Sequence, residues 1–367
     1  IMWGRQSYRL SPMDFEANAK DGHGTDWPIR YEDLAPWYDH IEKFIGVSGS
    51  KDGLAQLPDG EYLPPFELND AEKEFKQVIE TRFPGRKVIS GRVANLSKAQ
   101  PHHEELGRTS CQVRNFCDRG CSYGAYHSSL SSSLPAAQRT GNLTILTDVI
   151  VHSIVHDPRT GRVTGVRVID ARTKAGSTHE AKVVFSCAST IGTAQVLLNS
   201  TSEAMPNGLA NRSDMVGRNL MDHVFALSVA GILPKGPDTY YFGRRPTGMY
   251  IPRYRNLNAQ YSEFLRGYGF QGGSMRMGWT AGAMQPGMGE ALKDKVKQIG
   301  PWMVFTSGFG EMLPHADNRL TLGKETDKWG MAIPHIDVIL RDNEKKMVGT
   351  ILADGKAMVE AAGGMVI

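Results

Sequence analysis

Hydrophobic residues recur at helical spacing in two stretches of the N-terminal part of the chain. Between residues 31 and 45 the apolar positions fall three and four apart, and Asp33 and Pro36 lie near the start, where helices favour acidic residues and proline. Residues 70–83 form a second amphipathic stretch, which Asn69 precedes as a helix N-cap. We therefore predict two amphipathic helices in this part of the chain.

Apolar and β-branched residues alternate with polar ones in the middle of the chain, which is typical of strands. The predicted strands are residues 143–145, 149–156 and 163–170. The sequence D-P-R-T-G at residues 157–161 predicts a hairpin turn between the last two of these strands.

The stretch from residue 183 to residue 198 changes from strand to helix. Residues 183–187 are an apolar run that predicts a strand, residues 188–193 are mostly small, and residues 194–198 favour a buried helix. A strand that enters a helix through a small-residue turn is how α/β proteins place backbone N–H groups against a nucleotide. Because any βα unit has this pattern, a purely structural role remains open for this stretch.

Beyond residue 223 strand-like segments alternate with long glycine-bearing loops, and the one clear helical pattern is at residues 289–298. The predicted strands are residues 225–233, 250–254, 267–277, 304–313, 319–322 and 335–340. Such a run of strands is typical of an antiparallel sheet, so we predict a second region of that kind.

Composition excludes several classes of protein. With 367 residues the chain is long enough for two hydrophobic cores. Its 40% hydrophobic and 22% charged residues are typical of a folded protein and show no sign of disorder. A net charge of +3 gives no support for a nucleic-acid partner, and no apolar run approaches the roughly 20 residues that a transmembrane helix needs. The sequence lacks a Walker loop and a G-x-S-x-G elbow, which leaves P-loop chemistry and acyl transfer unsupported.

Three cysteines form the most chemically suggestive group. Cys111, Cys117 and Cys121 are separated by five and then three residues, and thiolates this close in sequence can ligate iron or zinc. Three ligands would leave room for a three-iron cluster or for one non-cysteine ligand. Arg114 and Arg119 would help to hold a negatively charged cluster. The alternative is a compact loop whose small buried cysteines need no metal.

Several stretches, taken in order, resemble the glucose–methanol–choline (GMC) family of flavin oxidoreductases. The sequence W-P-I-R-Y-E-D-L-A-P-W-Y resembles the family's W-x-x-x-Y-x-D-L-x-P-Y-Y helix, and E-M-L-P-H-A-D-N-R-L-T-L resembles its E-x-x-P-x-x-x-N-R-V-T-L strand pair. The resembling stretches are residues 1–8, 26–42, 124–137, 143–154, 183–223 and 311–322. They are distributed along most of the chain, from residue 1 to residue 322, and their shared order is more specific than any single motif.

The resemblance implies an α+β or α/β fold with two discontinuous domains. Residues 1–48 and 130–224 would form a partial, Rossmann-like FAD-binding domain, and residues 49–129 and 225–367 an antiparallel-sheet substrate-binding or cap domain. Both are expected to be incomplete, because the family's G-x-G-x-x-G would precede Ile1 and its proton-accepting histidine would follow Ile367. The chain would then be a fragment of a longer protein.

The resemblance further implies a dehydrogenase that oxidises a CH–OH group of a sugar, glycoside or polyol by hydride transfer to FAD. The most similar branch is that of bacterial sugar, glucoside and gluconate dehydrogenases. Some of these carry an iron–sulfur cluster near a cysteine group and pass electrons to a cytochrome, a quinone or a small partner subunit. The residues expected to contact the cofactor are Trp3, Gly4, Gln6, Val151, Cys187, Ala188 and Ser189.

Substrate contacts are expected in the antiparallel region, where Gln271, Arg276 and Trp279 are hypothetical sugar ligands because sugars favour planar hydrogen-bonding groups beside an aromatic face. Plain strand packing is the alternative for these three residues. The sequence departs from the family where Thr193 replaces a proline and Cys187-Ala188 replaces Ala-Gly, so the local turn is expected to differ.

Two alternative functions remain open. One is an oxidase of the same family that returns electrons to oxygen. The other is a non-catalytic electron-transfer or sugar-binding module in which the cysteine loop is the active part. The compartment, cytoplasmic or periplasmic, also stays open.

Overall fold

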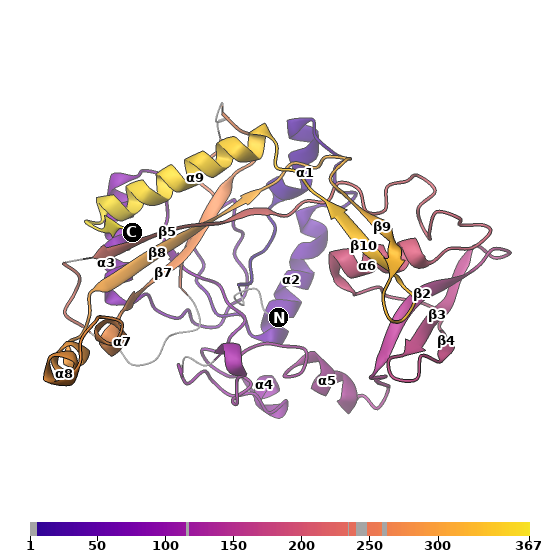
Figure 1. Cartoon of the computed structure of the whole chain (residues 1–367), viewed down its shortest axis with the longest axis horizontal. Coiled ribbons are helices and arrows are strands. Elements are labelled where there is room, and N and C mark those ends of the chain that lie inside the picture. The colour runs from indigo at the N-terminus through magenta and orange to yellow at the C-terminus, as the bar shows by residue number, and fades with distance from the viewer. Residues whose placement is uncertain (1–5, 115–116, 234, 240–247, 259–262) are drawn as a thin grey trace. The chain divides into compact units, whose positions relative to one another are not determined.

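The structure is a computed structural model that describes residues 6–114, 117–233, 235–239, 248–258 and 263–367 (Figure 1). The chain forms two compact units. Unit 1 consists of Ile1–Asn142, His223–Met312 and Asp342–Ile367, and unit 2 of Leu143–Asp222 and Leu313–Arg341. Residues 1–48, which the resemblance assigns to the flavin domain, therefore group with the 223–312 segment. The cofactor-binding and substrate-binding roles of the two domains stay predictions.

Unit 1 is built around an antiparallel sheet in the order β1-β6-β7-β8-β5-β11. Its strands are β1 (Ile89–Ser90), β5 (His223–Leu233), β6 (Met249–Ile251), β7 (Tyr268–Arg276), β8 (Trp302–Glu311) and β11 (Met365–Val366). Residues along β8 alternate between buried and partly exposed, as expected when one face of a sheet covers a core. The predicted antiparallel region is thus confirmed for the segments within residues 223–312.

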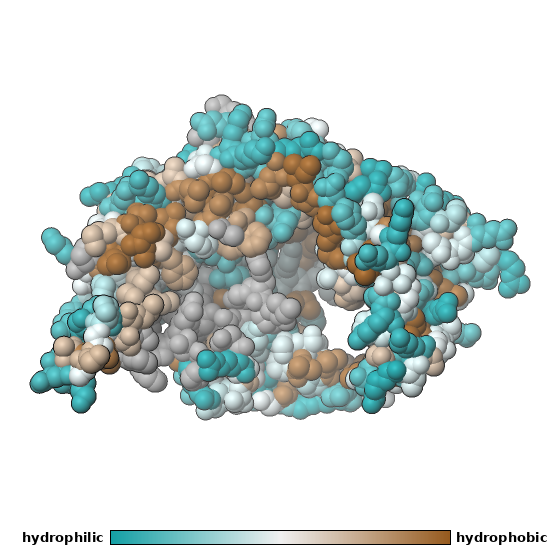
Figure 2. Space-filling view, in the orientation of Figure 1, coloured by the Kyte–Doolittle hydropathy of each residue, from teal (hydrophilic) through white to brown (hydrophobic). Residues whose placement is uncertain are grey.

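The long helix α9 (Asp342–Ala361) packs on β5 and β8, and its Met347, Ile351 and Met358 are fully buried. Gly308 and Gly310 allow this close approach, since a Cβ atom at either position would overlap a side chain of α9. Figure 2 shows that hydrophobic residues gather along β5 and the adjoining side of α9.

Helices and loops complete unit 1. They are α1 (Pro12–Asp21), α2 (Tyr31–Ile45), α3 (Asp70–Arg82), α4 (Pro101–Glu105), the 3-10 turn η1 (Cys117–Arg119), α5 (Ser133–Arg139), α7 (Gly278–Ala283) and α8 (Gly289–Lys297). The predicted helices at 31–45 and 70–83 are confirmed, the second to within one residue. Helix α3 places Phe75 and Ile79 in the same core as the sheet and α9, and Asn69 caps it by accepting the Glu72 N–H at 2.9 Å.

Unit 2 contains the antiparallel sheet β2 (Val149–Asp157), β3 (Arg162–Asp170) and β4 (Gly176–Glu180), in that order. It also contains the pair β9 (Arg319–Thr326) and β10 (Ala332–Asp337), and helix α6 (Ser189–Asn199), which packs against β2, β9 and β10. The predicted hairpin at 157–161 is confirmed, and Gly161 takes the left-handed conformation with φ 68°.

Two predicted strands of unit 2 are wrong. Residues 143–145 and 183–187 have no strand structure, and Val183 and Phe185 are 67% and 85% exposed. A strand exists only where a neighbour supplies hydrogen bonds, and no segment of the described chain pairs with these two. The mixed helix and antiparallel-sheet content of the expected fold is confirmed, but the Rossmann-like arrangement is not.

In the part of the chain that the structure describes, no helix combines the length and the apolar character needed to cross a membrane.

Candidate functional site

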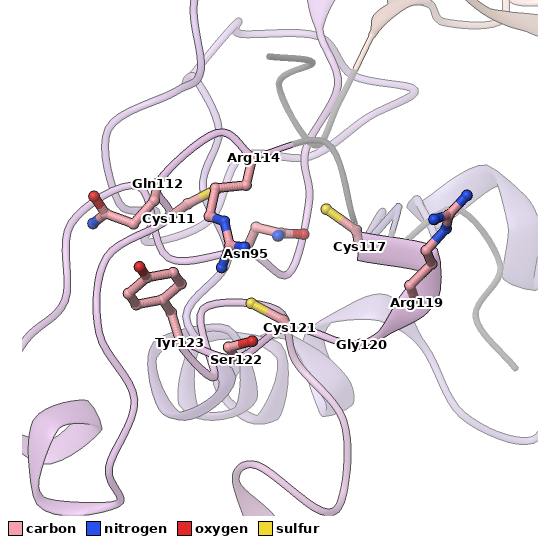
Figure 3. A pocket seen from close by; sticks show the side chains of 10 residues that line it. All are labelled: Asn95, Cys111, Gln112, Arg114, Cys117, Arg119, Gly120, Cys121, Ser122 and Tyr123. Atoms are coloured by element: carbon pink, nitrogen blue, oxygen red, sulfur yellow. The ribbon is translucent and has the colours of Figure 1, made fainter.

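The three clustered cysteines line one pocket of unit 1, with a volume of about 200 Å³ (Figure 3). They come from a loop between α4 and α5 that wraps back on itself. The other residues that line the pocket are Asn95, Gln112, Arg114, Arg119, Gly120, Ser122 and Tyr123. The three cysteines that lie close together in sequence thus line one pocket, and their role as metal ligands stays a prediction.

Backbone hydrogen bonds hold the two arms of this loop together. The Thr109 N–H donates to the Tyr123 carbonyl at 2.9 Å, and the Cys111 N–H donates to the Leu96 carbonyl at 2.8 Å. Val113 has φ 51°, a left-handed conformation that β-branched residues rarely adopt, and its N–H points back to the Cys111 sulfur at 3.4 Å. These contacts fold the loop around the pocket.

All four cysteines of the chain are thiols rather than disulfides. Among the described residues, no three His, Cys, Asp or Glu side chains converge closely enough to hold a single metal ion. That finding disfavours a mononuclear zinc site, in which every ligand contacts one ion at about 2.0–2.3 Å. The iron–sulfur cluster and the metal-free loop both stay hypotheses for this pocket.

Positive charge surrounds the cysteine pocket. Arg119 lines it, and the Arg114 guanidinium lies over the Tyr123 ring, 5.5 Å from its centroid. Arg108 is buried behind the loop, where its Nε donates to the Gly124 carbonyl at 2.9 Å and its Nη1 has no partner. Burial lowers the pKa of Arg108 to about 10, against the opposing effect of Cys121. A negatively charged group in the pocket would be stabilised by these cations.

Asn95 is the residue that sequence reasoning missed. It is 1% exposed and lines the pocket, yet its side-chain oxygen and nitrogen have no hydrogen-bond partner among the residues that the structure describes. Buried amides are nearly always paired, so this one points to a partner that the protein itself does not supply. Its local sequence, V-A-N-L, holds no motif that would have singled it out.

The expected cofactor contacts are divided between the units. Gln6 lies in unit 1, bridged to Val93, and accepts a hydrogen bond from the Tyr8 hydroxyl. Val151 lies in β2 of unit 2 and is 42% exposed, and Cys187, Ala188 and Ser189 form the exposed N-terminal end of α6. Trp3 and Gly4 lie outside the described residues. The cofactor roles of these residues stay predictions.

The three hypothetical sugar ligands lie in or just after β7. Gln271 is a partly buried residue within the strand, and Trp279 belongs to α7. Arg276 is already engaged, because its guanidinium pairs with Asp238 at 3.0 Å and donates to the carbonyls of Thr239 and Gly300. These contacts favour the packing alternative for Arg276, and a substrate role stays a prediction for all three.

Residues 94–225 match the family model described as GMC oxidoreductase. The fructose dehydrogenase large subunit of Gluconobacter japonicus is 26% identical, and 2-methyl-1,2-propanediol dehydrogenase of Mycolicibacterium austroafricanum is 27% identical; each alignment covers 92% of this chain and 60% of the relative. Paromamine 6'-oxidase of Streptomyces fradiae is 27% identical over 60% of this chain and 39% of its own length. The chain therefore spans about three fifths of the first two relatives, and the resemblance stated from its motifs is confirmed.

Proposed function

Since the chain belongs to the GMC oxidoreductase family, we propose that it is part of an FAD-dependent dehydrogenase that oxidises a CH–OH group of a sugar, glycoside or polyol. The observation that carries this proposal is the pair of dehydrogenase alignments over 92% of the chain, one to an enzyme named for a sugar and one to an enzyme named for a diol. The oxidase alignments cover 60% of the chain, so a dehydrogenase is the better-supported form.

The start of α6 offers a fitting place for the adenosine and phosphate part of FAD. No side chain caps this helix, and residues 187–189 before and at its first turn are exposed. Backbone N–H groups at a helix N-terminus favour anions, and Val151 on the neighbouring β2 presents an exposed apolar surface for a base. When bound, FAD supplies the acceptor for the hydride that leaves the substrate carbon as the hydroxyl loses its proton.

We also propose that Cys111, Cys117 and Cys121 bind an iron–sulfur cluster of three irons. The donor set fits, because three thiols line one pocket, arginines surround it and a buried amide there lacks a partner. A cluster bound there supplies one-electron acceptance, through which the two electrons of the oxidation would leave one at a time. The acceptor would be a quinone, a cytochrome or a partner subunit, in line with a relative that is named a large subunit.

The enzyme proposal is tested on the full-length protein under anaerobic conditions. The flavin absorption is expected to bleach on addition of a sugar or polyol that is a substrate. Absence of bleaching with every alcohol of a broad panel would contradict the dehydrogenase and favour a non-catalytic module. Rapid reoxidation of the bleached flavin by air alone would favour the oxidase.

The cluster proposal is tested by iron analysis of Cys117→Ser. We expect the iron content to fall sharply, because one thiolate ligand is lost. Cys187→Ser is the matched control, since Cys187 is exposed and lies in unit 2, and it should leave the iron content unchanged. Iron-free wild-type protein, or unchanged iron in Cys117→Ser, would overturn the proposal.

A further inference from the structure

Asn95 is buried, lines the cysteine pocket and leaves both polar atoms of its amide without a partner. Figure 3 shows the amide and the sulfurs of Cys117 and Cys121 pointing into the same space. An amide that is desolvated without a hydrogen bond is unfavourable for folding. A role that depends on a bound group would explain why such a residue is present here.

The backbone holds Asn95 in this position. The Ser48 hydroxyl donates to the Asn95 carbonyl at 2.6 Å, the Asn95 N–H donates to the Val93 carbonyl at 2.8 Å, and the residue is bridged to Tyr126. The next residue, Leu96, accepts the N–H of Cys111. The amide is therefore preorganised relative to the cysteine loop, and binding would require little rearrangement.

The chemistry of the pocket identifies the partner of this amide. The guanidinium groups of Arg114 and Arg119 only donate hydrogen bonds, whereas thiolate and sulfide sulfurs accept them. The Gln112 side chain, the other amide that lines the pocket, already donates to the Ser110 carbonyl at 3.0 Å. Asn95 is thus the lining amide whose N–H groups remain available for sulfur.

We propose that Asn95 donates a side-chain N–H hydrogen bond to sulfur in the cysteine pocket and thereby raises the reduction potential of the cluster bound there. This inference rests on the cluster proposed above. One-electron reduction adds a negative charge to the cluster, and a donated hydrogen bond stabilises the reduced form more than the oxidised form. Asn95 is accordingly a positioning and tuning residue rather than an iron ligand.

The test is a redox titration of the full-length protein, in which the cluster is followed by electron paramagnetic resonance. Asn95→Leu is similar in size and lacks a donor, so we expect about a tenfold shift of the ratio of oxidised to reduced cluster toward the oxidised form, equal to about 59 mV for one electron. Asn95→Asp, which replaces the donor by an anion, should lower the potential at least as far. Gln138→Leu, at an exposed amide of α5 that does not line the pocket, is the control and should leave the potential unchanged.

The outcomes separate this inference from the cluster proposal. Absence of iron in the wild-type protein would contradict both the cluster and the role of Asn95. If the wild type contains iron but Asn95→Leu leaves the reduction potential unchanged, the proposed role of Asn95 is wrong and the cluster proposal stands. Loss of iron in Asn95→Leu with retention in Asn95→Asp would show that the residue is an iron ligand, which also overturns the inference.

A second measurement does not depend on iron. Thermal unfolding of the metal-free protein should show a higher midpoint for Asn95→Leu than for the wild type, because the variant removes an unpaired buried amide. A lower midpoint would mean that the amide has an internal partner, and that result would contradict the proposal.

Discussion

Asp354 and Asn95 are both polar residues buried in unit 1, but their surroundings differ. The Asp354 carboxylate on α9 accepts hydrogen bonds from the hydroxyls of Tyr254 and Tyr268, at 2.6 and 2.5 Å, and pairs with Arg255 and Arg86 at 2.9 and 3.0 Å. The Asn95 amide has no partner and faces a pocket. Both oxygens of Asp354 have partners within the fold, whereas the Asn95 amide has none among the described residues.

The contrast gives a criterion for separating structural polar residues from functional ones. Burial by itself raises the pKa of Asp354, but the hydrogen bonds from Tyr254 and Tyr268 and the charge of Arg86 outweigh it, so the pKa lies below its usual range. The charged form is therefore the one that the fold stabilises. At Asn95 the described fold supplies no partner for the side-chain amide, and we propose that a bound group does.

The largest expected effect is that of Asp354→Ala. Removing the carboxylate leaves the buried Arg86 and the partly buried Arg255 near two tyrosine hydroxyls, and we expect the free energy of unfolding to fall by about 3 kcal/mol. Urea denaturation measures this loss. Glu360→Ala, at an exposed position of the same helix, is the control and should have little effect. A loss of unfolding free energy well below about 1 kcal/mol in Asp354→Ala would contradict the view that the partners of Asp354 stabilise the fold.

The next effect is a pH dependence. Because the folded-state pKa of Asp354 is lowered, its contribution is fully present above the unfolded-state value of about 3.9 and is lost as pH falls through the folded-state pKa. The difference in unfolding free energy between wild type and Asp354→Asn should therefore be constant near neutral pH and shrink below about pH 4. Urea denaturation of both proteins at several pH values measures this difference. A difference in unfolding free energy that grows as the pH falls would contradict the expected direction of this effect.

A smaller effect, of opposite sign, is expected at Asn95. In the metal-free protein Asn95→Leu should raise the free energy of unfolding by about 1 kcal/mol, since it removes an unsatisfied buried amide. The measurement is the same urea series. If Asn95→Leu destabilises the protein as much as Asp354→Ala does, the fold stabilises both polar residues, and partners within the fold would no longer separate structural from functional residues.

The smallest effect is expected at an exposed ion pair of unit 1. Lys51 and Glu61 lie 2.8 Å apart, and both side chains are more than half exposed, so water screens their attraction. Glu61→Gln should leave the thermal midpoint unchanged within error. A clear shift would mean that exposure is a poor guide to the importance of polar groups in this fold.

Local signals allowed the helices of unit 1 to be predicted. Asp33 for α2, and the Asn69 cap for α3, act within a few residues of the start of their helices, whereas Pro36 lies inside α2 rather than at its start. The hairpin between β2 and β3 was predictable for the same reason, because Asp157 and Gly161 make the turn themselves.

Long-range requirements explain the failures. The apolar runs at 143–145 and 183–187 have strand-like composition, but strand structure needs a hydrogen-bonding neighbour, which the described chain does not provide. The importance of Asn95 was also hidden, because its burial comes from Ser48, Tyr126 and the cysteine loop, which are remote in sequence. The cysteines were found because their spacing along the chain is itself the signal.

The two units are nested along the chain, and this has a consequence for the order of synthesis. Unit 1 needs α9 and β11 from its last segment, whereas unit 2 is complete once Arg341 has been made. The ribosome adds about 5–20 residues per second, so the first segment of unit 1 waits about 10–40 s while the next 200 or so residues are made. Strand β8 is made only near the end of that interval, and the face that α9 will cover is then open to water until α9 has followed, so a nascent chain in this state is a natural substrate for chaperones.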